Sequence, residues 1–243
     1  MRRKGRGEIV AKSVLIVGLG GLGVPAALAA IRGGVSQLGL VDPDPVEFSN
    51  LARQVIYRES DLGRPKVDAA ADRLRRLAPG LEIETLRFAL EASNAARVIE
   101  NFDFVIDATD SPAAKFLNND VCVAAGIPFI YAGVLGLAGQ TLTVIPGRTA
   151  CLRCLFERPP DEAEIASCRE AGIVGPVAGA IGMLQGGEAA RWASGAELRL
   201  AGMILTFDGA RGASSRTIAV PAREGCSCGA SRAATASAVG SRA

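Results

Sequence analysis

A glycine-rich segment near the start of the chain has the spacing of a phosphate-binding turn. The segment, Gly18-Leu-Gly-Gly-Leu-Gly23, follows a short apolar run and precedes a pattern typical of a helix, and Asp42 ends the next apolar run. Glycines let the backbone approach a phosphate closely, a helix N-terminus favours negative charge, and an acidic side chain at this distance accepts hydrogen bonds from a ribose. We therefore expect this segment and Asp42 to bind a nucleotide. A turn that serves packing alone is the weaker alternative.

The residues after Asp42 favour a triphosphate over a dinucleotide. Arg53 and Lys66 both follow it closely. An arginine can contact phosphate oxygens through two N–H groups, and a lysine can act on them as a point charge. Asn50 and Gln54 add neutral hydrogen-bond donors. Because each of these side chains alone is as readily a solvated surface residue, the expectation depends on the whole set.

The composition limits the chemistry that is available. The chain has no histidine, which removes the commonest general base and the commonest nitrogen ligand for metals. Catalysis must then use carboxylates, lysine, arginine, cysteine or a bound metal. Six cysteines in a chain of 243 residues without a secretion signal favour metal or redox chemistry over a disulfide framework. Cys122 lies in an apolar part of a predicted helix, and we expect it to be packed in the core.

A repeated strand-and-helix pattern positions these residues. It predicts strands at 13–17, 37–42, 81–87, 104–107, 128–134, 140–145, 203–208 and 216–221, and helices at 21–32, 65–78, 91–100, 112–125 and 175–194. The short, continuously apolar strands are typical of a parallel sheet that is buried on both faces. The pattern predicts an α/β fold with a Rossmann-like, doubly wound, mostly parallel sheet and a C-terminal antiparallel extension.

Length and charge set the wider expectations. We expect one domain over residues 1–229 and a disordered tail over 230–243, because the tail has few side chains that could be buried. The net charge of +2, from 27 basic and 25 acidic residues, is too balanced to indicate nucleic acid or a membrane surface as a partner. No apolar stretch reaches membrane-spanning length and no signal core follows the basic N-terminus, so we expect a cytoplasmic protein.

A series of spaced motifs resembles the ThiF/MoeB/HesA family, bacterial relatives of the ubiquitin-activating enzymes. The motifs are Gly18–Gly23, Asp42-x-Asp44, Ser49-Asn-Leu-x-Arg-Gln54, Gly63-x-x-Lys66, Asp107-Ala-Thr-Asp110, Gly139-Gln140, Cys151-Leu-Arg-Cys154 and Gly182-x-Leu-Gln-x-x-Glu188. They occur in this order over roughly residues 13–229, so the resemblance is far more specific than any single motif.

The resemblance implies that a carboxylate attacks the α-phosphate of ATP and that pyrophosphate leaves. The family's usual substrate is the Gly-Gly end of a small ubiquitin-like sulfur carrier. Arg53, Lys66 and an Mg²⁺ ion on Asp110 would neutralise charge on the phosphates, and an ionised carboxylate needs no general base. The implied ATP-binding residues are Gly18, Gly20, Gly21, Gly23, Asp42, Asp44, Ser49, Asn50, Arg53, Gln54, Lys66, Asp110 and Ser111, the last standing where asparagine is common.

The cysteines resemble two further features of the family. Cys151 with Cys154 and Cys226 with Cys228 resemble the halves of a structural Zn²⁺ site made of four thiolates. The second pair has one intervening residue where the family usually has two, so its loop must be strained or reorganised; a metal-free, reduced loop is the alternative. Cys168 matches the position where some members carry a cysteine that joins covalently to the activated carrier, and a bystander thiol is its alternative.

A homodimer is also implied, with one departure. Family members commonly carry an N-terminal arginine motif that reaches the neighbouring subunit's nucleotide. Here twelve residues precede the first predicted strand, and Arg2, Arg3 and Arg6 are poor substitutes for that motif. We expect the chain either to rely on Arg53 and Lys66 or to receive the missing group from another protein.

These observations lead to one main hypothesis and three rivals. The main hypothesis is an ATP-dependent adenylyltransferase that activates a sulfur carrier for cofactor, cysteine or natural-product biosynthesis, with a sulfurtransferase as a possible further partner. The rivals are adenylation of another carboxylate on a small molecule, peptide or tRNA, a weakened member that binds nucleotide as a scaffold, and a nicotinamide oxidoreductase. Arg53, Lys66 and the absence of histidine argue against the last.

Overall fold

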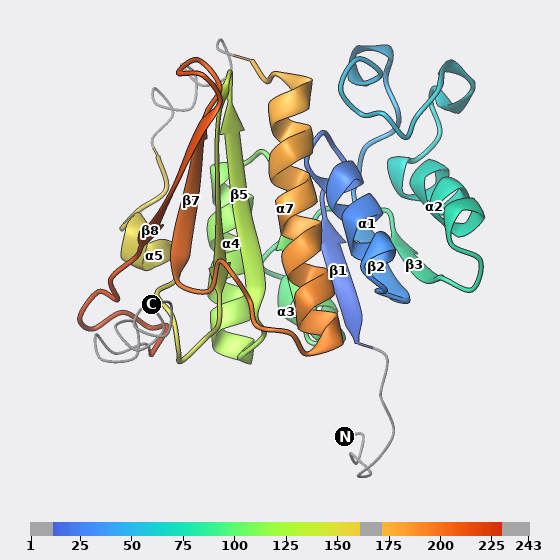
Figure 1. Cartoon of the computed structure of the whole chain (residues 1–243). Coiled ribbons are helices and arrows are strands. Elements are labelled where there is room, and N and C mark those ends of the chain that lie inside the picture. The colour runs from blue at the N-terminus through green and yellow to red at the C-terminus, as the bar shows by residue number, and fades with distance from the viewer. Residues whose placement is uncertain (1–11, 161–171, 230–243) are drawn as a thin grey trace.

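The computed structural model describes residues 12–160 and 172–229, which form an eight-stranded sheet with helices on both faces (Figure 1). The strands are β1 (Ser13–Val17), β2 (Gln37–Val41), β3 (Glu82–Leu86), β4 (Phe104–Asp107), β5 (Phe129–Leu135), β6 (Ala138–Val144), β7 (Met203–Asp208) and β8 (Ser214–Ala219). The α-helices are α1 (Gly23–Arg32), α2 (Lys66–Leu77), α3 (Ala95–Ile99), α4 (Pro112–Ala125), α5 (Leu152–Leu155) and α7 (Gly175–Ser194). Two short 3-10 helices, η1 (Phe48–Asn50) and η2 (Glu59–Asp61), lie between β2 and α2.

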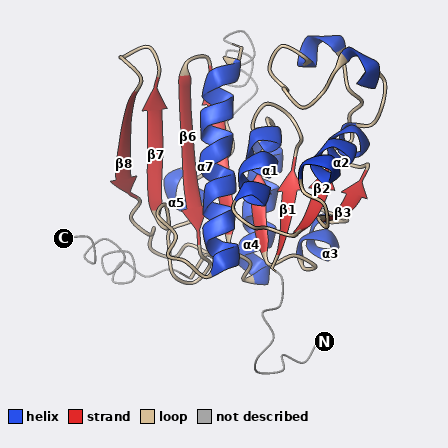
Figure 2. Ribbon diagram, turned by 45° about the vertical axis from the view of Figure 1, so that its right-hand side comes forward, coloured by secondary structure: helices blue, strands red, loops and turns tan. Residues whose placement is uncertain are grey.

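The sheet has a parallel part and an antiparallel part. The strand order is β3-β2-β1-β4-β5-β6-β7-β8, and the first five of these strands are parallel. β6 pairs antiparallel with β5, β7 with β6, and β8 with β7, so β6 and β8 run opposite to β1 (Figure 2). The predicted doubly wound sheet with an antiparallel extension is confirmed.

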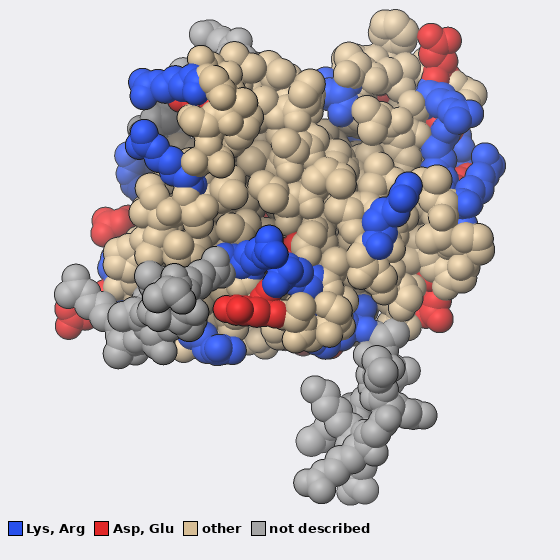
Figure 3. All heavy atoms as spheres, viewed as in Figure 1, with Lys and Arg blue, Asp and Glu red and all other residues tan. Residues whose placement is uncertain are grey.

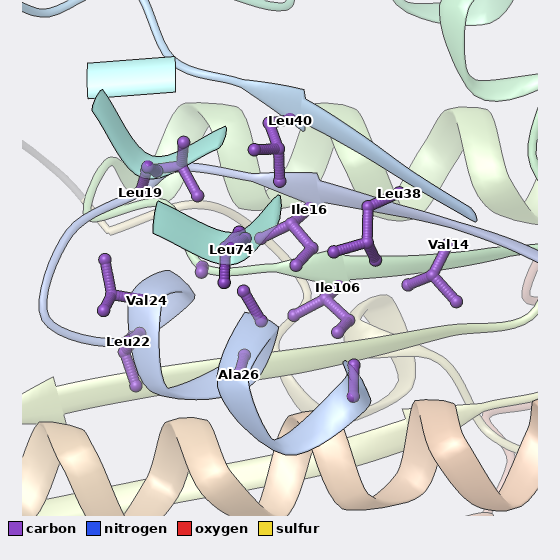
Figure 4. Close-up of a cluster of buried hydrophobic side chains, with 14 of the residues drawn as sticks. Val14, Ile16, Leu19, Leu22, Val24, Ala26, Leu38, Leu40, Leu74 and Ile106 are labelled. Carbon is purple, nitrogen blue, oxygen red and sulfur yellow. The ribbon is translucent and has the colours of Figure 1, made fainter. Parts of the chain in front are cut away.

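Alternating apolar side chains place a hydrophobic core on each face of the sheet. In β1, Val14 and Ile16 belong to one buried cluster and Leu15 and Val17 to the other. The first cluster packs under α1, α2 and α7, and Figure 4 shows Val14 and Ile16 beside the side chains of β2 and β4. The second packs under α3, α4 and α5. Burial on both faces explains why these strands read as continuous apolar runs.

Two glycines let α7 pack directly against α1. A Cβ at Gly182 would overlap the carbonyl oxygen of Leu22, and one at Gly186 would overlap that of Ala26. The glycines in this part of the predicted motif therefore serve close helix packing. Glu188, two residues further on, is buried and accepts hydrogen bonds from the Thr143 hydroxyl and from backbone N–H groups of the segment before β7. Gly182, Gly186 and Glu188 therefore stabilise the packing of α7 in the fold.

Several elements have bounds that differ from the predicted ones, and two of them have a clear physical reason. The helix predicted at 91–100 begins only at Ala95, because the Asn94 side chain accepts a hydrogen bond from the Glu91 N–H and forms a turn first. The last strand begins at Ser214 because its pairing with β7 starts opposite Asp208. The short helix α5, in the cysteine-bearing loop, was not predicted. None of the described helices combines the length and apolar character that crossing a membrane requires.

Candidate nucleotide site

A large cleft opens at the carboxyl ends of the parallel strands. It has a volume of about 1780 Å³, and its lining includes residues that follow β1, β2 and β4 together with residues of β5–β8. The chain leaves β1 toward β2 on one side and enters β4 on the other, which makes this edge a topological switch point. Open α/β sheets bind their ligands at such points.

The glycine turn after β1 forms the floor of this cleft. Gly18 has a φ of +92° and packs against the backbone of Ala108 after β4, so a side chain there is excluded on both counts. A Cβ at Gly23 would overlap the carbonyl oxygen of Gly18. Gly20 and Gly21 line the cleft with their backbone exposed to it. The turn therefore presents bare backbone immediately before the N-terminus of α1, which suits a phosphate.

Asp42 holds this turn from the end of β2. Its carboxylate accepts hydrogen bonds from the N–H groups of Leu19 (2.7 Å) and Asp44 (2.9 Å), and the residue is only 5% exposed. Burial raises the pKa of Asp42, while the Leu19 N–H and the nearby Lys66 ammonium act to lower it. One carboxylate thus supports the glycine turn while facing the cleft, as a ribose-binding residue must.

Lys66 brings a buried positive charge to the same place. It opens α2, is 6% exposed, and its Nζ lies 2.8 Å from an Asp44 oxygen and 3.9 Å from an Asp42 oxygen. The Tyr57 hydroxyl donates to the Leu19 carbonyl oxygen at 3.1 Å, and burial raises the pKa of Tyr57. Tyr57 therefore ties the segment between β2 and α2 to the glycine turn, a role that the sequence did not indicate.

The segment around η1 supplies the remaining polar groups of this side. Arg53 lines the cleft, and its Nη1 donates to the Ser49 carbonyl oxygen at 2.8 Å, which leaves other guanidinium N–H groups for a ligand. Asn50 and Gln54 are buried and line the cleft. The Gln54 Oε1 is buried with no hydrogen-bond partner among the described residues. The side chains that the sequence grouped by spacing are also grouped in space.

Asp110 faces the cleft from the loop after β4. It is exposed and lines the cleft, with Ser111 beside it as the N-cap of α4. The preceding carboxylate, Asp107, is buried and accepts hydrogen bonds from the Thr109 N–H and hydroxyl and from the Asn118 amide. The two aspartates of the Asp107–Asp110 motif therefore differ in role, since one organises the loop and the other is open to a ligand.

The structure brings most of the predicted site residues together. Those that line the cleft are Gly18, Gly20, Gly21, Asp42, Asp44, Asn50, Arg53, Gln54, Lys66, Asp110 and Ser111. Gly23 and Ser49 do not line it: Gly23 permits the tight turn, and Ser49 supports Arg53 through its carbonyl oxygen. Cys168 lies outside the described residues.

The antiparallel strands extend the cleft with a polar row. Gln140, Thr206 and Arg216 are paired partners on β6, β7 and β8, and all three line the cleft. The Gln140 amide donates to the Tyr131 hydroxyl at 2.6 Å, and burial raises the pKa of Tyr131 to about 12. This row begins on β6, beside β5, and continues to β8 at the edge of the sheet. It gives the cleft a second half, beyond the glycine turn.

Four cysteines form a cluster that could bind a metal ion. The sulfur atoms of Cys151, Cys154, Cys226 and Cys228 all lie within 4.8 Å of one another, with 3.7 Å between Cys151 and Cys226 and 3.6 Å between Cys154 and Cys228. A tetrahedral ion with Zn–S bonds of about 2.3 Å requires S···S separations of roughly 3.8 Å. The sulfur positions therefore fit zinc.

Two glycines with left-handed backbone flank the second cysteine pair. Gly225 (φ +71°) precedes Cys226 and Gly229 (φ +68°) follows Cys228, a conformation that glycine adopts without strain. Burial acts to raise the pKa of Cys226, but hydrogen bonds from the Cys228 N–H and the neighbouring thiols lower it to about 7, whereas burial raises the pKa of Cys151. Cys122 is buried in the core, as predicted.

Comparison with known proteins identifies sequence relatives. Residues 1–230 match the ThiF family. A protein of Caenorhabditis briggsae named adenylyltransferase and sulfurtransferase MOCS3 is 40% identical over 213 residues, which cover 87% of this chain and 53% of the relative. The protein of that name from Arabidopsis thaliana is 37% identical over 205 residues, covering 84% and 44%. The chain spans about half the length of these curated relatives.

Solved structures share the fold. E. coli MccB with ATP superposes with a TM-score of 0.76 at 20% identity, covering 90% of this chain and 67% of MccB. PaaA superposes with a TM-score of 0.70 at 22% identity, covering 86% and 64%. At these identities the likeness is one of architecture.

Proposed function

Because the chain belongs to the ThiF family, we propose that it transfers AMP from ATP to the C-terminal carboxylate of a ubiquitin-like sulfur carrier. Its relatives are named adenylyltransferases, which agrees with the nucleotidyltransferase class expected from the sequence. The observation that carries the proposal is the cleft itself. There, bare glycine backbone, two cationic side chains and an open carboxylate converge from four separate segments of the chain.

The residues of the cleft suit the parts of Mg²⁺-bound ATP. The glycine turn would receive the phosphates and Asp42 the ribose. Arg53, Lys66, Asn50 and Gln54 would surround the phosphates. Asp110 is open to the cleft, and one or two carboxylates together with substrate phosphates are the ligands Mg²⁺ usually takes in such sites.

The proposed reaction needs positioning and charge neutralisation more than proton transfer. The attacking carboxylate is ionised at neutral pH, so it forms a bond to the α-phosphorus while the bond to pyrophosphate breaks, and no proton has to be removed. Arg53 and Lys66 would bind the phosphates and stabilise the negative charge on the departing pyrophosphate. A bound Mg²⁺ ion would add further positive charge there. The absence of histidine is compatible with this chemistry.

The second half of the cleft supports a polymeric second substrate. The volume of about 1780 Å³ exceeds the roughly 300–1,000 Å³ typical of small-ligand pockets. Its polar row offers hydrogen-bonding groups on three neighbouring strands, which suit the backbone of an extended peptide. A flexible C-terminal tail fits this shape better than a compact small molecule.

We expect Zn²⁺ in the cysteine cluster to be structural. Four thiolates leave no open coordination position, so the ion would contribute folding energy rather than chemistry. The cluster joins the segment after β6 to the segment after β8.

A second copy of the chain and a sulfurtransferase are the further expected partners. The middle of the face over α7 shows few charged side chains in Figure 3. Met183 and Leu184 are 50% and 40% exposed on this helix, and apolar residues at such a position favour a protein contact. A sulfurtransferase would supply the sulfur that replaces AMP on the carrier.

Pyrophosphate exchange tests the proposal. The protein is incubated with ATP, Mg²⁺, labelled pyrophosphate and a carrier that ends in Gly-Gly, and the label entering ATP is measured. We expect exchange that disappears when the two glycines are removed from the carrier. It should also fall by about 10³-fold in Asp110→Ala and stay unchanged in Glu84→Ala, an exposed carboxylate on β3.

The rival functions give different results in the same experiment. Exchange that is indifferent to the Gly-Gly end indicates another carboxylate as substrate. ATP binding without exchange indicates a nucleotide-binding scaffold, and a preference for NAD over Mg²⁺-bound ATP indicates an oxidoreductase. Full exchange by folded Asp110→Ala contradicts the proposed mechanism.

A further inference from the structure

A buried lysine lies directly beneath the loop that carries Asp110. Lys115, in the first turn of α4, is 9% exposed. Its Nζ donates to the carbonyl oxygens of Thr109 (2.6 Å) and Ala132 (2.6 Å) and lies 3.4 Å from an Asp107 oxygen. An ammonium group has three hydrogens, and these three acceptors occupy all of them. Lys115 therefore has no hydrogen left for a substrate, although it borders the cleft.

The counter-charge of Lys115 is equally constrained. Asp107 is 1% exposed, and its second carboxylate oxygen accepts from the Thr109 N–H, the Thr109 hydroxyl and the Asn118 amide. A buried ion pair gains little net stability, because desolvation of the two charges offsets their attraction. Such a pair is more readily explained by the conformation that it specifies.

That conformation is the orientation of the peptide unit between Thr109 and Asp110. Lys115 holds the Thr109 carbonyl, and Asp107 holds the Thr109 N–H and hydroxyl, so the residue is fixed on both sides. The C=O and N–H of a trans peptide point in opposite directions. With its carbonyl turned toward Lys115, this unit must direct the Asp110 N–H away from it. The position of the Asp110 backbone is therefore fixed by these hydrogen bonds, whichever rotamer its side chain adopts.

Lys115 also ties this loop to the next strand. Ala132 belongs to β5, and the ammonium lies 5.3 Å from the ring centre of Tyr131, the residue before it. From the other face of the sheet, the Gln185 amide of α7 donates to the Asp107 carbonyl oxygen at 2.8 Å. The end of β4 is thus connected to β5 and α7, which leaves the loop little freedom to move.

We infer that Lys115 is a positioning residue for the metal-bound nucleotide, fixing the loop so that the Asp110 carboxylate stays available to Mg²⁺. The inference rests on the proposed function and adds a residue that acts through another. It predicts that the loss of Lys115 weakens metal binding in the nucleotide complex more than it weakens nucleotide binding itself.

Manganese binding tests this role without relying on catalysis. Mn²⁺, a paramagnetic substitute for Mg²⁺, is titrated by electron paramagnetic resonance into the protein saturated with a non-hydrolysable ATP analogue. In Lys115→Met we expect the Mn²⁺ affinity to fall by about 10–100-fold, the range for losing a group that orients a metal ligand. The Mg²⁺ concentration for half-maximal pyrophosphate exchange should rise by a similar factor. Metal-free analogue binding should change less than about two-fold, because Lys115 has no free donor for it.

Two further variants separate positioning from a general loss of stability. Lys12→Met is the matched control: Lys12 also donates to a backbone carbonyl, that of Trp192 (2.7 Å), and lies 4.6 Å from an aromatic ring centre, but it does not line the cleft. It should leave Mn²⁺ affinity unchanged. Lys115→Arg retains a charged donor and should keep the affinity within about five-fold of wild type. If Lys115→Met does not fold, the pair Lys115→Met and Asp107→Asn, which leaves no unpaired buried charge, is measured in its place.

The outcomes are distinct. Mn²⁺ affinity within two-fold of wild type in the Lys115 variant, or an equal loss in Lys12→Met, overturns the positioning role and leaves the proposed function standing. Wild-type protein that neither binds Mn²⁺ with the ATP analogue nor exchanges pyrophosphate removes the proposed function and this inference together. Selective loss of Mn²⁺ affinity with rescue by arginine supports the inference.

Discussion

Charged side chains and thiols collect at opposite edges of the same sheet. Asp42, Lys66 and Asp110 lie near the carboxyl ends of parallel strands, whereas Cys151 and Cys226 come after β6 and β8. β6 and β8 run antiparallel to the first five strands of the sheet, so their carboxyl ends lie at the other edge (Figure 2). Because the strand direction reverses at β6, the chain enters the cysteine cluster from the end of the sheet opposite the cleft, although Leu152 of α5 also lines the cleft.

We therefore expect substitutions in the cleft and substitutions in the cysteine cluster to have different effects. The cleft contains polar groups whose hydrogen-bonding capacity is not fully used within the described structure. They include the Gln54 Oε1 and the remaining N–H groups of Arg53, and these groups are available to a ligand. In the cysteine cluster each sulfur faces three others. Changes at the cleft should therefore affect chemistry, and changes at the cluster should affect folding.

Removing the metal from the cysteine cluster should have the largest effect. We expect one zinc ion per chain, and its removal by a chelator or by Cys228→Ser should lower the free energy of unfolding by at least about 5 kcal/mol. For a domain of this size that shifts Tm by roughly 10–20 °C. Elemental analysis and thermal unfolding measure both quantities. Cys122→Ala, which changes a core cysteine outside the cluster, should keep its zinc; a folded wild type free of zinc contradicts the prediction.

Arg53→Ala should give the opposite result, a loss of activity at constant stability. The side chain makes one hydrogen bond within the described structure, to the Ser49 carbonyl oxygen, so little folding energy is lost. If it contacts the phosphates in the transition state, kcat/KM for adenylation should fall by about 10²–10³-fold. Arg58→Ala, a nearby exposed arginine that does not line the cleft, is the control. A fall in Tm large enough to explain the lost activity would show that Arg53 contributes to folding as well as to chemistry.

Substitutions at the contact between α1 and α7 test how much this close packing contributes to the stability of the fold. Gly182→Ala places a methyl group against the carbonyl oxygen of Leu22, and such overpacking typically costs about 1–3 kcal/mol. Gly179→Ala, one turn earlier in α7, meets no atom within 4 Å and should stabilise the helix by up to about 1 kcal/mol. Denaturant unfolding of the two variants measures the difference. Equal free energies of unfolding for the two variants would show that α1 and α7 can move apart to accept the added methyl group.

The sequence predicted the elements well where the signal is local. β1, β4, β7, α4 and α7 have the predicted bounds, because continuous apolar runs, a proline at the helix start and a left-handed glycine at the helix end mark them. The family resemblance is confirmed by the match over residues 1–230. The roles assigned to individual residues stay predictions, although the structure gathers most of them in one cleft.

What the sequence missed depends on contacts between distant segments. Tyr57 and Lys115 act through hydrogen bonds to the carbonyl oxygens of Leu19 and Ala132, and no spacing rule predicts which backbone group a side chain will meet after folding. A weak signal was present for Lys115, since it and Asp120 are the only charged residues of α4. A lone charge near the start of an apolar helix indicates a buried partner, but it does not identify that partner.

The smallest expected effect is a pH-dependent contribution of Asp61 to the free energy of unfolding. Asp61 of η2 lies beside the segment that carries Lys66, and burial favours its neutral form, but the Arg58 N–H and the Arg73 and Arg64 guanidinium groups lower its pKa. A carboxyl with a lowered pKa in the folded state stabilises the fold above its unfolded pKa and loses that contribution as pH falls through the folded value. Asp61→Asn should therefore be less stable than wild type at pH 7, by about 1 kcal/mol because solvent screens the arginines. The difference should shrink as pH falls below the unfolded pKa of about 3.9 and vanish once pH is below the lower folded value. Urea unfolding of both proteins from pH 7 to pH 2 measures it, and a difference independent of pH would assign the effect to packing.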